Sequence, residues 1–295
     1  MSSLIRGGRP NAKVKFITAK TSILLGQLLT LNFPKINVQK VICSGGVWKN
    51  TQRITTPGTK INAGETIKVY LSPTQGYSYL FSKDLILSET KDWVVVYKEP
   101  LITVAMDRSN MHFNLMAGLN HYYGFQDYRQ GVQPITRLDY RVGGLCLFSK
   151  HKNAERRLFM QMQQRRIKKR YIAVVNSNEP RQVRCAIINN ISHKRQAFID
   201  PLGKYAKTFF VYHKLKCSRY HLYHAITKTG RRHQVRFHAS LSIGALVNDE
   251  LYSSKYNDRH APIGLIANEL RFIWNGQKIN IKLPENYIDQ TLGFL

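Results

Sequence analysis

A single carboxylate, Asp139, stands where the sequence could hold a reactive group. Arg137 precedes it by two residues, a glycine pair follows at Gly143 and Gly144, and the apolar run Leu145–Phe148 has the length of a buried strand. An acid placed just before a core strand, in a chain this rich in bases, is either a structural salt-bridge partner or the reactive group. The local residues favour the structural role, so chemistry at Asp139 requires partners from elsewhere in the chain.

Two further segments carry side chains that could act with such a carboxylate. The basic run Arg165–Arg170, a solvated or phosphate-facing loop, leads into an apolar strand that begins with Tyr171. The segment Thr229–Ser240 begins at a glycine turn, becomes helical in pattern, and contains three arginines.

The composition predicts a polyanionic partner. The chain has 295 residues, of which 45 are Lys or Arg and 17 are Asp or Glu, so its formal charge is +28. This excess is far larger than solubility requires, and it is spread along the whole sequence rather than gathered in one tail. Nucleic acid and an anionic membrane are the two candidates, and the even distribution favours nucleic acid.

Other features narrow the class of protein. The sequence contains no run of about 18 apolar residues, so a membrane-spanning helix is not expected. The N-terminus lacks the apolar core of a signal peptide. The four cysteines are widely separated, which fits a reducing compartment, so we expect a cytoplasmic protein, with organellar targeting left open. His221 and His224 have no acidic or cysteine partners nearby and no glycine-rich nucleotide loop is present, so neither a metal nor a cofactor is expected.

The apolar pattern predicts a small α+β region followed by a larger, strand-dominated one. A polar, turn-forming stretch at residues 73–79 separates them. Helical spacing is found in segments 22–31, 37–43, 110–123 and 153–164. Strand-like runs are found at 47–50, 67–71, 85–87, 93–97, 171–175, 185–188, 206–215, 220–227, 266–274 and 278–283. Asn275-Gly276 between the last two runs is a strong hairpin signal.

Three segments of the larger region resemble, in order and spacing, the motifs of the RluA-type pseudouridine synthases. These are R-L-D-x-x-x-G-G-L-x-L-F-S-K at 137–150, R-I-K-K-R-Y-I-A-V-V at 166–175 and T-G-R-R-H-Q-V-R-F-H at 229–238. V-V-Y-K-E-P at 95–100 is similar to the family's opening strand. The resemblance covers nearly the whole chain beyond Ser22 and implies an α+β fold with a mixed, largely antiparallel sheet flanked by helices and loops.

The resemblance also implies a reaction and the residues that perform it. Uridine in RNA would be isomerised by breaking the C1′–N1 bond, turning the base and joining C1′ to C5. Asp139 would be the catalytic carboxylate, Tyr171 would stack on the flipped base, and Arg236 would pair with Asp139. The sequence leaves open whether Asp139 attacks C1′ or abstracts a proton. The neighbouring basic residues would bind RNA or help to flip the base: Arg137, Lys169, Arg170, Arg231, Arg232 and His233.

The smaller region resembles an S4-like RNA-binding domain over about Ser22–Pro73. The match rests on S-G-G-V-x-x-N from Ser44 and T-K-I-x-A-G-E-x-I from Thr59, although Thr51 stands where that family normally has glycine. The expected organisation is a flexible basic segment at 1–17, an S4-like domain at 18–73, a linker at 74–83 and a catalytic domain at 84–295.

We therefore predict an RNA pseudouridine synthase, with ribosomal RNA favoured over transfer RNA by analogy with S4-bearing relatives and a monomer favoured. The alternative is a synthase-like protein that binds RNA or the ribosome with little or no catalysis. The positive charge supports both equally, whereas a pure binder has no need of a carboxylate that faces phosphates. The chain departs from the family's usual residues at Thr136, Tyr140–Gly143, Glu99–Leu101, Arg232 and Asn248.

Overall fold

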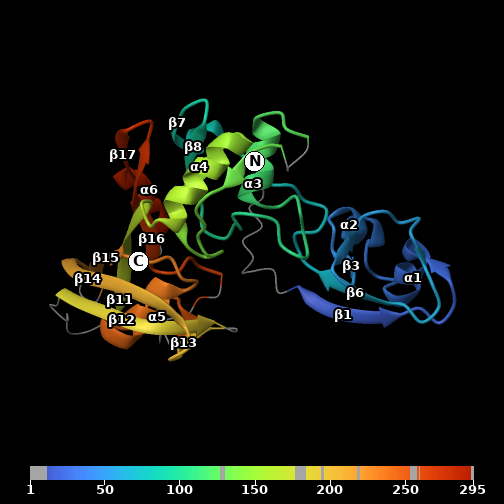
Figure 1. The fold of residues 1–295 in the computed structure, drawn as a ribbon. Coiled ribbons are helices and arrows are strands. Elements are labelled where there is room, and N and C mark those ends of the chain that lie inside the picture. The colour runs from blue at the N-terminus through green and yellow to red at the C-terminus, as the bar shows by residue number, and fades with distance from the viewer. Residues whose placement is uncertain are drawn as a thin grey trace. The chain divides into compact units, whose positions relative to one another are not determined.

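The computed structural model describes residues 12–126, 130–176, 184–193, 196–217, 220–252, 258 and 260–293. The chain divides into two compact units (Figure 1). One unit combines residues 1–81 with 102–128, and the other combines 82–101 with 129–295. The expected domain boundaries stay a prediction, and the units differ from them mainly in residues 102–128, which pack with the N-terminal part of the chain.

The N-terminal unit is built on a four-stranded sheet in the order β1 (Lys13–Thr18), β6 (Thr66–Leu71), β3 (Val47–Lys49) and β4 (Gln52–Ile54). One face of this sheet shares an apolar core with two helices, α1 (Leu25–Asn32) and α2 (Val38–Cys43). The smaller elements of this unit are the paired strands β2 (Ile23–Leu24) and β5 (Lys60–Ile61) and the helix α3 (Leu115–Tyr122).

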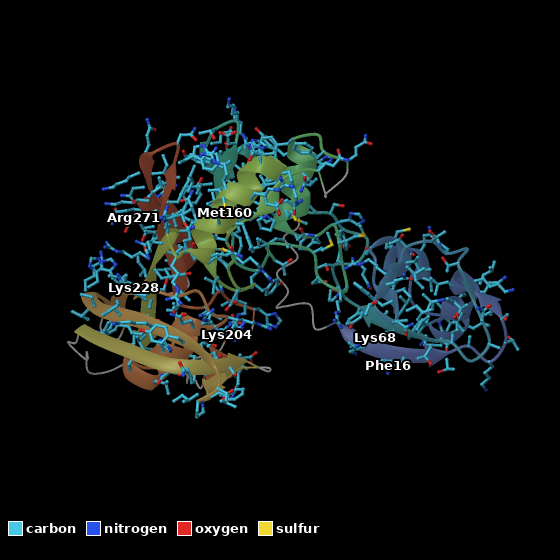
Figure 2. All side chains as sticks on the ribbon, viewed as in Figure 1. Phe16, Lys68, Met160, Lys204, Lys228 and Arg271 are labelled. Atoms are coloured by element: carbon cyan, nitrogen blue, oxygen red, sulfur yellow. The ribbon has the colours of Figure 1, made fainter. Side chains whose placement is uncertain are left out.

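The expected flexible segment at residues 1–17 is wrong for Lys13–Ile17, which belong to β1. This strand pairs with β6 along its whole length, from Lys13 opposite Leu71 to Thr18 opposite Thr66, and it buries Ile17 in the core. Backbone pairing thus orders a segment whose other side chains are exposed, including Phe16 (Figure 2). Residues 1–11 lie outside the described residues.

The second unit contains a large mixed sheet, which confirms the predicted fold class. Eleven strands of the described residues belong to it, and all neighbours run antiparallel except β10 and β16, which are parallel. The main order is β13 (Ala197–Ile199), β12 (Arg184–His193), β14 (Lys204–Cys217), β15 (Tyr220–Thr227), β11 (Lys168–Asn176), β16 (Leu265–Trp274), β10 (Gly143–Ser149), β8 (Trp93–Lys98) and β7 (Ile86–Glu89). Two further strands, β17 (Gln277–Lys282) and β9 (Gln133–Pro134), pair with β16 and β10.

Helices flank this sheet. They are α4 (Lys152–Gln163), α5 (Gln234–Ser242) and α6 (Glu285–Leu292), with short 3₁₀ turns η1 (Lys83–Leu85) and η2 (Glu250–Tyr252). The predicted amphipathic helix is confirmed as α4, and the predicted hairpin is confirmed with Asn275 and Gly276 both at positive φ. No helix within the described ranges is long and apolar enough to cross a membrane.

The helix predicted at residues 110–123 begins only at Leu115. Asn114 adopts an extended conformation and its side chain accepts a hydrogen bond from the Ala117 N–H, so it caps the helix there. The preceding turn is held by Asn110, whose side-chain oxygen accepts from the N–H groups of His112 and Phe113. Local side-chain bonding in this segment replaces the first turn of the expected helix.

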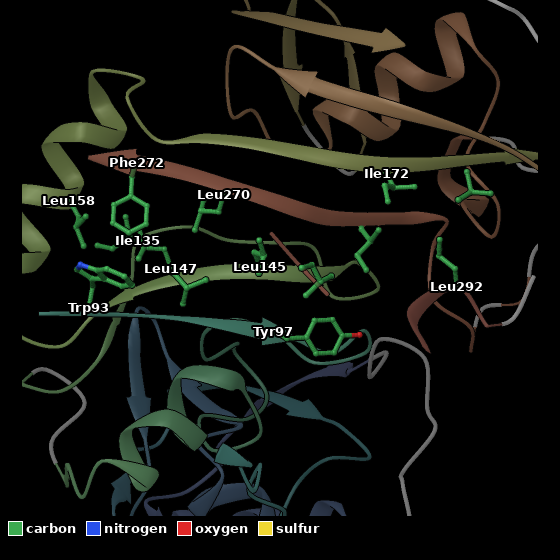
Figure 3. Packing of buried hydrophobic residues seen from close by; sticks show 14 of the residues in the cluster. Trp93, Tyr97, Ile135, Leu145, Leu147, Leu158, Ile172, Leu270, Phe272 and Leu292 are labelled. Atoms are coloured by element: carbon green, nitrogen blue, oxygen red, sulfur yellow. The ribbon is translucent and has the colours of Figure 1, made fainter. Parts of the chain in front are cut away.

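The central strands of the second unit share a core that holds β10 in place (Figure 3). Leu145 and Leu147 of β10 pack there with Leu270 from β16, and the rings of Trp93 and Phe272 meet edge to face at 5.1 Å. The inward-facing residues of β10 are completely buried. The apolar run after Asp139 is therefore the buried strand that the sequence predicts.

Gly144, the second residue of β10, is the position where this strand approaches β16 most closely. It lies opposite Ala267 with φ +122°, and a Cβ added there would stand 2.4 Å from the Ala267 carbonyl oxygen. We expect Gly144→Ala to lower the free energy of unfolding by at least about 2 kcal/mol, through backbone strain and a clash with the neighbouring main chain. Urea unfolding measures this change.

The control is Gly230→Ala, because a Cβ at Gly230 meets no atom of the described residues within 4 Å and its φ is not positive. That variant should keep wild-type stability. Equal stability of the two variants would contradict the close approach of β10 to β16.

Candidate active site

Asp139 lies in the loop between β9 and β10, and it is both paired and accessible. Its Oδ2 accepts a hydrogen bond from Arg236 Nη1 at 2.8 Å, and His233 Nε2 lies 3.7 Å from the same oxygen. The side chain nevertheless keeps 28% of its surface exposed. The two roles that the sequence allows, salt-bridge partner and reactive group, are therefore compatible in one residue.

Arg236, on α5, joins Asp139 to a second carboxylate. Its Nε donates to Asp249 Oδ2 at 2.7 Å and its Nη2 donates to Asp249 Oδ1 at 2.8 Å, while Nη1 is directed at Asp139. Asp249 is completely buried. A planar guanidinium held at two points on one side has little freedom on the other, so Asp249 fixes the direction in which Arg236 meets Asp139.

The pairing of Asp249 with Arg236 was not predicted from the sequence, although a signal for the turn that carries Asp249 exists. Asn248 stands where the resembled family has glycine, and its φ is +61°. Asparagine tolerates this left-handed conformation better than most residues. Its side chain also secures the turn, because Nδ2 donates to the Pro262 carbonyl and Oδ1 accepts from the Asp258 N–H. The turn thus places Asp249 within hydrogen-bonding distance of Arg236, although it contains asparagine instead of glycine.

The surroundings of Asp139 keep its carboxylate ionised. Burial raises its pKa, but the charges of Arg236 and His233 and the hydrogen bond from Arg236 outweigh this, so that the pKa lies below its ordinary value. Burial lowers the pKa of Arg236, while hydrogen bonds and charge from Asp249 and Asp139 raise it further than burial lowers it. The stability that Asp139 contributes is present above its ordinary pKa and is lost as the pH falls through the lowered value.

Tyr171 lies close to this loop because four neighbouring strands pair side by side. Gly144 of β10 is opposite Ala267 of β16, Ala267 is opposite Tyr171 of β11, and Tyr171 is opposite Ala225 of β15. The ring is only 8% exposed. It belongs to one apolar cluster with residues next to the two charged partners: Leu138, Val142 and Val235.

The start of α5 orients Arg236. His233 precedes the helix in a left-handed conformation with φ +56°, which is uncommon for a residue with a side chain and is typical of functional sites. Its Nδ1 lies 3.2 Å from the hydroxyl of Tyr252, and the guanidinium of Arg236 lies 5.4 Å from the centre of the Tyr252 ring. Tyr252, which the sequence does not single out, therefore supports both basic residues of the site.

Gln234, the first residue of α5, ties the helix to the sheet. Its Oε1 accepts from the Thr229 hydroxyl and from the Arg231 N–H, at 2.8 and 3.0 Å. Its Nε2 donates to the Lys207 carbonyl and the Thr208 hydroxyl, at 3.0 and 2.9 Å. Because the buried Gln234 amide makes all four of these hydrogen bonds, it holds the start of α5 in a single position.

The predicted basic residues fall into two groups. Lys169 Nζ donates to the Arg137 carbonyl at 3.0 Å and lies 5.7 Å from the centre of the Tyr171 ring, so it braces the loop that carries Asp139. The Arg137 side chain is exposed, and so is Arg232, whose charge also lowers the pKa of Asp139. Arg232 and His233 thus lie near the carboxylate, and Lys169 holds the backbone of Arg137 two residues before it.

The second group lies away from Asp139 by its contacts. Arg231 Nε donates to the Tyr205 carbonyl at 3.0 Å, and Arg170 Nη1 pairs with the buried Glu269 at 3.3 Å. Arg170 and Glu269 are opposite each other across β11 and β16, which explains the pair. Arg170 lines a surface hollow with other charged residues, two of which are labelled in Figure 2: Lys168, Lys169, Lys228, Glu269 and Arg271.

Lys98, at the end of β8, is a buried cation that the sequence does not single out. It is completely buried, and its Nζ donates to the carbonyl oxygens of Glu99 at 2.8 Å and Tyr140 at 3.3 Å. The same Tyr140 carbonyl accepts from the Leu101 N–H at 2.7 Å. Because Tyr140 follows Asp139 directly, these bonds fix the backbone on one side of the carboxylate.

Burial lowers the pKa of Lys98 to about 8. In the unfolded chain a lysine keeps its proton up to about pH 10.4, so between these values the unfolded state binds more protons and stability rises with pH. We therefore expect the free energy of unfolding of the wild type, relative to Lys98→Met, to rise from pH 8 to pH 10. Urea unfolding of both proteins over this range measures the difference, and a constant difference would contradict the buried amine.

No group of three or more His, Cys, Asp or Glu side chains in the described part of the chain lies close enough to hold a metal ion. What the site does contain is a buried arginine between two carboxylates, one of them accessible, beside an aromatic ring on a mixed sheet. An arrangement of this kind can present an ionised carboxylate to a bound molecule.

The comparison with known families gives the class. The family model of the RNA pseudouridylate synthases matches residues 92–241, which include Asp139, Tyr171 and Arg236. The chain belongs to this family, and the predicted relationship to the RluA-type synthases is confirmed at that level. It is a pseudouridine synthase and therefore an isomerase, as the sequence predicts.

Curated relatives extend over most of the chain. Ribosomal large subunit pseudouridine synthase C of Buchnera aphidicola (strain APS) is 25% identical over 287 residues, covering 88% of this chain and 90% of the relative. The enzyme of the same name from Escherichia coli (strain K12) is 26% identical over 279 residues, covering 85% and 82%.

Two solved structures share the fold. Human RNA pseudouridylate synthase domain containing 1 has a TM-score of 0.56 at 19% identity and covers 70% of this chain and 85% of its own. Human RNA pseudouridylate synthase domain containing 4 has a TM-score of 0.55 at 18% identity, covering 72% and 95%. These matches agree with the mixed α+β architecture described above.

Proposed function

We propose that this enzyme isomerises uridines of ribosomal RNA and that Asp139 is its catalytic carboxylate. The observation that carries the proposal is the state of Asp139, which is held ionised by Arg236 at 2.8 Å while 28% of its side chain stays accessible. An ionised carboxylate that stays accessible can reach the sugar of a bound uridine. The remaining residues of the site support the same chemistry.

In this proposal each neighbour has a separate task. The Asp139 carboxylate acts at the sugar of the target uridine, either by attacking C1′ or by removing a proton. Arg236 holds it ionised and in place, and Asp249 holds Arg236. Tyr171 supports the uracil ring once it has left its stack, since a flipped base offers a face to an aromatic side chain. Arg137 is exposed next to Asp139 and is available to a phosphate or to the space that the base vacates.

The choice of substrate follows the relatives. Those from Buchnera and Escherichia coli are named for the large ribosomal subunit, so we place ribosomal RNA first and transfer RNA second. Extruding a base costs least where it is unpaired, so the target uridine lies in a loop or a single strand. We further propose that the N-terminal unit is an S4-like RNA-binding domain, in keeping with its two helices on a small sheet.

Mapping of pseudouridines in total RNA tests this function. Cells without the gene should lack one or more pseudouridines of the large ribosomal RNA. A plasmid with the wild-type gene should restore them, and a plasmid with Asp139→Asn should not. Restoration by both plasmids would contradict the assignment of Asp139 as the catalytic carboxylate. Unchanged ribosomal RNA together with the loss of a transfer RNA pseudouridine would contradict ribosomal RNA as the substrate. An unchanged map would favour a protein that only binds RNA.

A further inference from the structure

One face of the sheet in the N-terminal unit carries a row of alternating aromatic and basic residues. Phe16 of β1 is opposite Lys68 of β6, Lys68 is opposite Trp48 of β3, and Trp48 is opposite Arg53 of β4. Residues that are directly opposite on neighbouring strands project from the same face of a sheet. The row therefore crosses all four strands on a single side.

Side-chain contacts agree with this placement. Lys68 Nζ lies 5.0 Å from the centre of the Phe16 ring and 5.4 Å from that of Tyr70, two residues further along β6. The Arg53 guanidinium lies 4.7 Å from the centre of the Trp48 ring. Phe16 and Lys68 project next to each other in Figure 2. Each cation of the row thus lies close to a ring on the same side of the sheet.

The core of this unit lies on the opposite face of the sheet. Ile17, Ile67 and Val69, the neighbours of the row along β1 and β6, are buried there with the helices. Phe16, in contrast, exposes 68% of its surface. A phenylalanine that contributes so little to the core, on a strand with a lysine over its ring, offers a free aromatic face.

Arg108, which also belongs to the N-terminal unit, adds a third cation to this surface. Its Nη1 donates to the Tyr70 hydroxyl at 3.0 Å, and its carbonyl accepts from Trp48 Nε1 at 2.9 Å. The neighbouring acid, Asp107, is engaged locally, because its Oδ1 accepts from the N–H groups of Ser109 and Asn110. Three cations thus surround the rings on this side.

We propose that this surface, named here the stacking face, binds unpaired nucleotides of RNA. It consists of Phe16, Trp48, Arg53, Lys68, Tyr70 and Arg108. One base would stack on the open ring of Phe16 and another on the pair of Trp48 and Arg53. Phe16 and Trp48 lie two strands apart, a distance of roughly 10 Å. The cations would take the phosphates between them. The inference rests on the proposed function only in taking RNA as the partner.

Binding of the full-length protein to a fluorescent 12-nucleotide oligoadenylate tests the stacking face. This probe contains no uridine, so its binding does not depend on isomerase activity, and failure of the proposed reaction would leave the result intact. Loss of one stacked base weakens binding by about tenfold, so we expect this change in Kd for Phe16→Ala and for Phe16→Leu. Phe16→Tyr, which keeps the ring, should bind like the wild type.

The matched control is Leu31→Ala, which shortens another exposed apolar residue of the same unit, 74% exposed on α1, and should leave the Kd unchanged. A 12-base-pair duplex RNA serves as the second probe, and the Phe16 variants should bind it as the wild type does. Wild-type affinity of Phe16→Leu for the oligoadenylate would overturn the proposal, as would an equal loss for duplex and single strand. Binding to vesicles of anionic lipid that depends on Phe16 while RNA binding does not would also overturn it.

Discussion

Arg236→Met is expected to give the largest loss of stability of any single substitution at the site. The variant leaves Asp249, which is completely buried, without the two hydrogen bonds that Arg236 donates. Removing one partner of a buried charge pair costs about 3–5 kcal/mol, because the remaining charge is left in an apolar environment. Urea unfolding should show this decrease.

The neighbouring Arg232 provides a control, because it belongs to the same segment but is exposed. Arg232→Met should change the free energy of unfolding by less than about 0.5 kcal/mol, as is usual for surface positions. Arg236→Lys should fall between the two, since it keeps a charge but loses the planar fork. Equal stabilities of the two methionine variants would mean that Arg236 does not join the carboxylates as described.

A double variant separates the structural task of Arg236 from its chemical one. Arg236→Met combined with Asp249→Leu replaces the buried pair with apolar side chains, which often restores the lost stability. Asp139 would still lack the cation that lowers its pKa and fixes its direction. We therefore expect a folded protein with little activity. Recovery of activity along with stability would show that Arg236 serves folding alone.

The core of this site could be predicted from the sequence because its parts occur in motifs. Asp139 and Arg236 are 97 residues apart, yet the family resemblance carried by the segments around them implied their pairing, and Arg236 Nη1 lies 2.8 Å from Asp139 Oδ2 in the structure. The buried strand after Asp139 and the hairpin at Asn275-Gly276 followed from local apolar and turn patterns. The strand and the hairpin depend on short-range information, whereas the pairing of Asp139 with Arg236 came from the family resemblance.

Features that depend on strand register could not be predicted in this way. The pairing of β11 with β16 places Arg170 opposite Glu269, to which it is bonded, whereas its expected role in RNA binding stays a prediction. Lys13–Ile17 were expected to be flexible because the N-terminal segment to which they belong is basic. They form a strand only by pairing with β6, some 50 residues later in the chain. Neither register leaves a signal in the local sequence.

The contacts made behind the charged pair could not be predicted for a different reason. Asp249, Tyr252 and Lys98 act through Arg236 and the backbone of Tyr140 rather than through a recognisable spacing. Supporting residues of this kind are identified only when the distances are known. The one sequence signal among them was the replacement of glycine by Asn248, which marks the turn that carries Asp249.

Asp139→Asn is expected to reduce the rate of isomerisation by at least about 10²-fold, the lower range for loss of a group that transfers a proton or acts as a nucleophile. Asparagine keeps the size of the side chain, and Arg236 keeps its two bonds to Asp249, so the variant should fold. Its affinity for RNA should be close to that of the wild type, because one of 17 acidic residues is lost from a chain with 45 basic ones.

The most direct measurement uses ribosomal RNA labelled with tritium at C5 of uridine. Joining C1′ to C5 displaces the hydrogen at C5, so each isomerisation releases one tritium into water. With enzyme in excess over RNA, the wild type should release tritium in a single turnover, whereas Asp139→Asn should bind the same RNA equally tightly and release it at least about 10²-fold more slowly. Equal rates of release from the two proteins would contradict the assignment of Asp139 as the catalytic carboxylate.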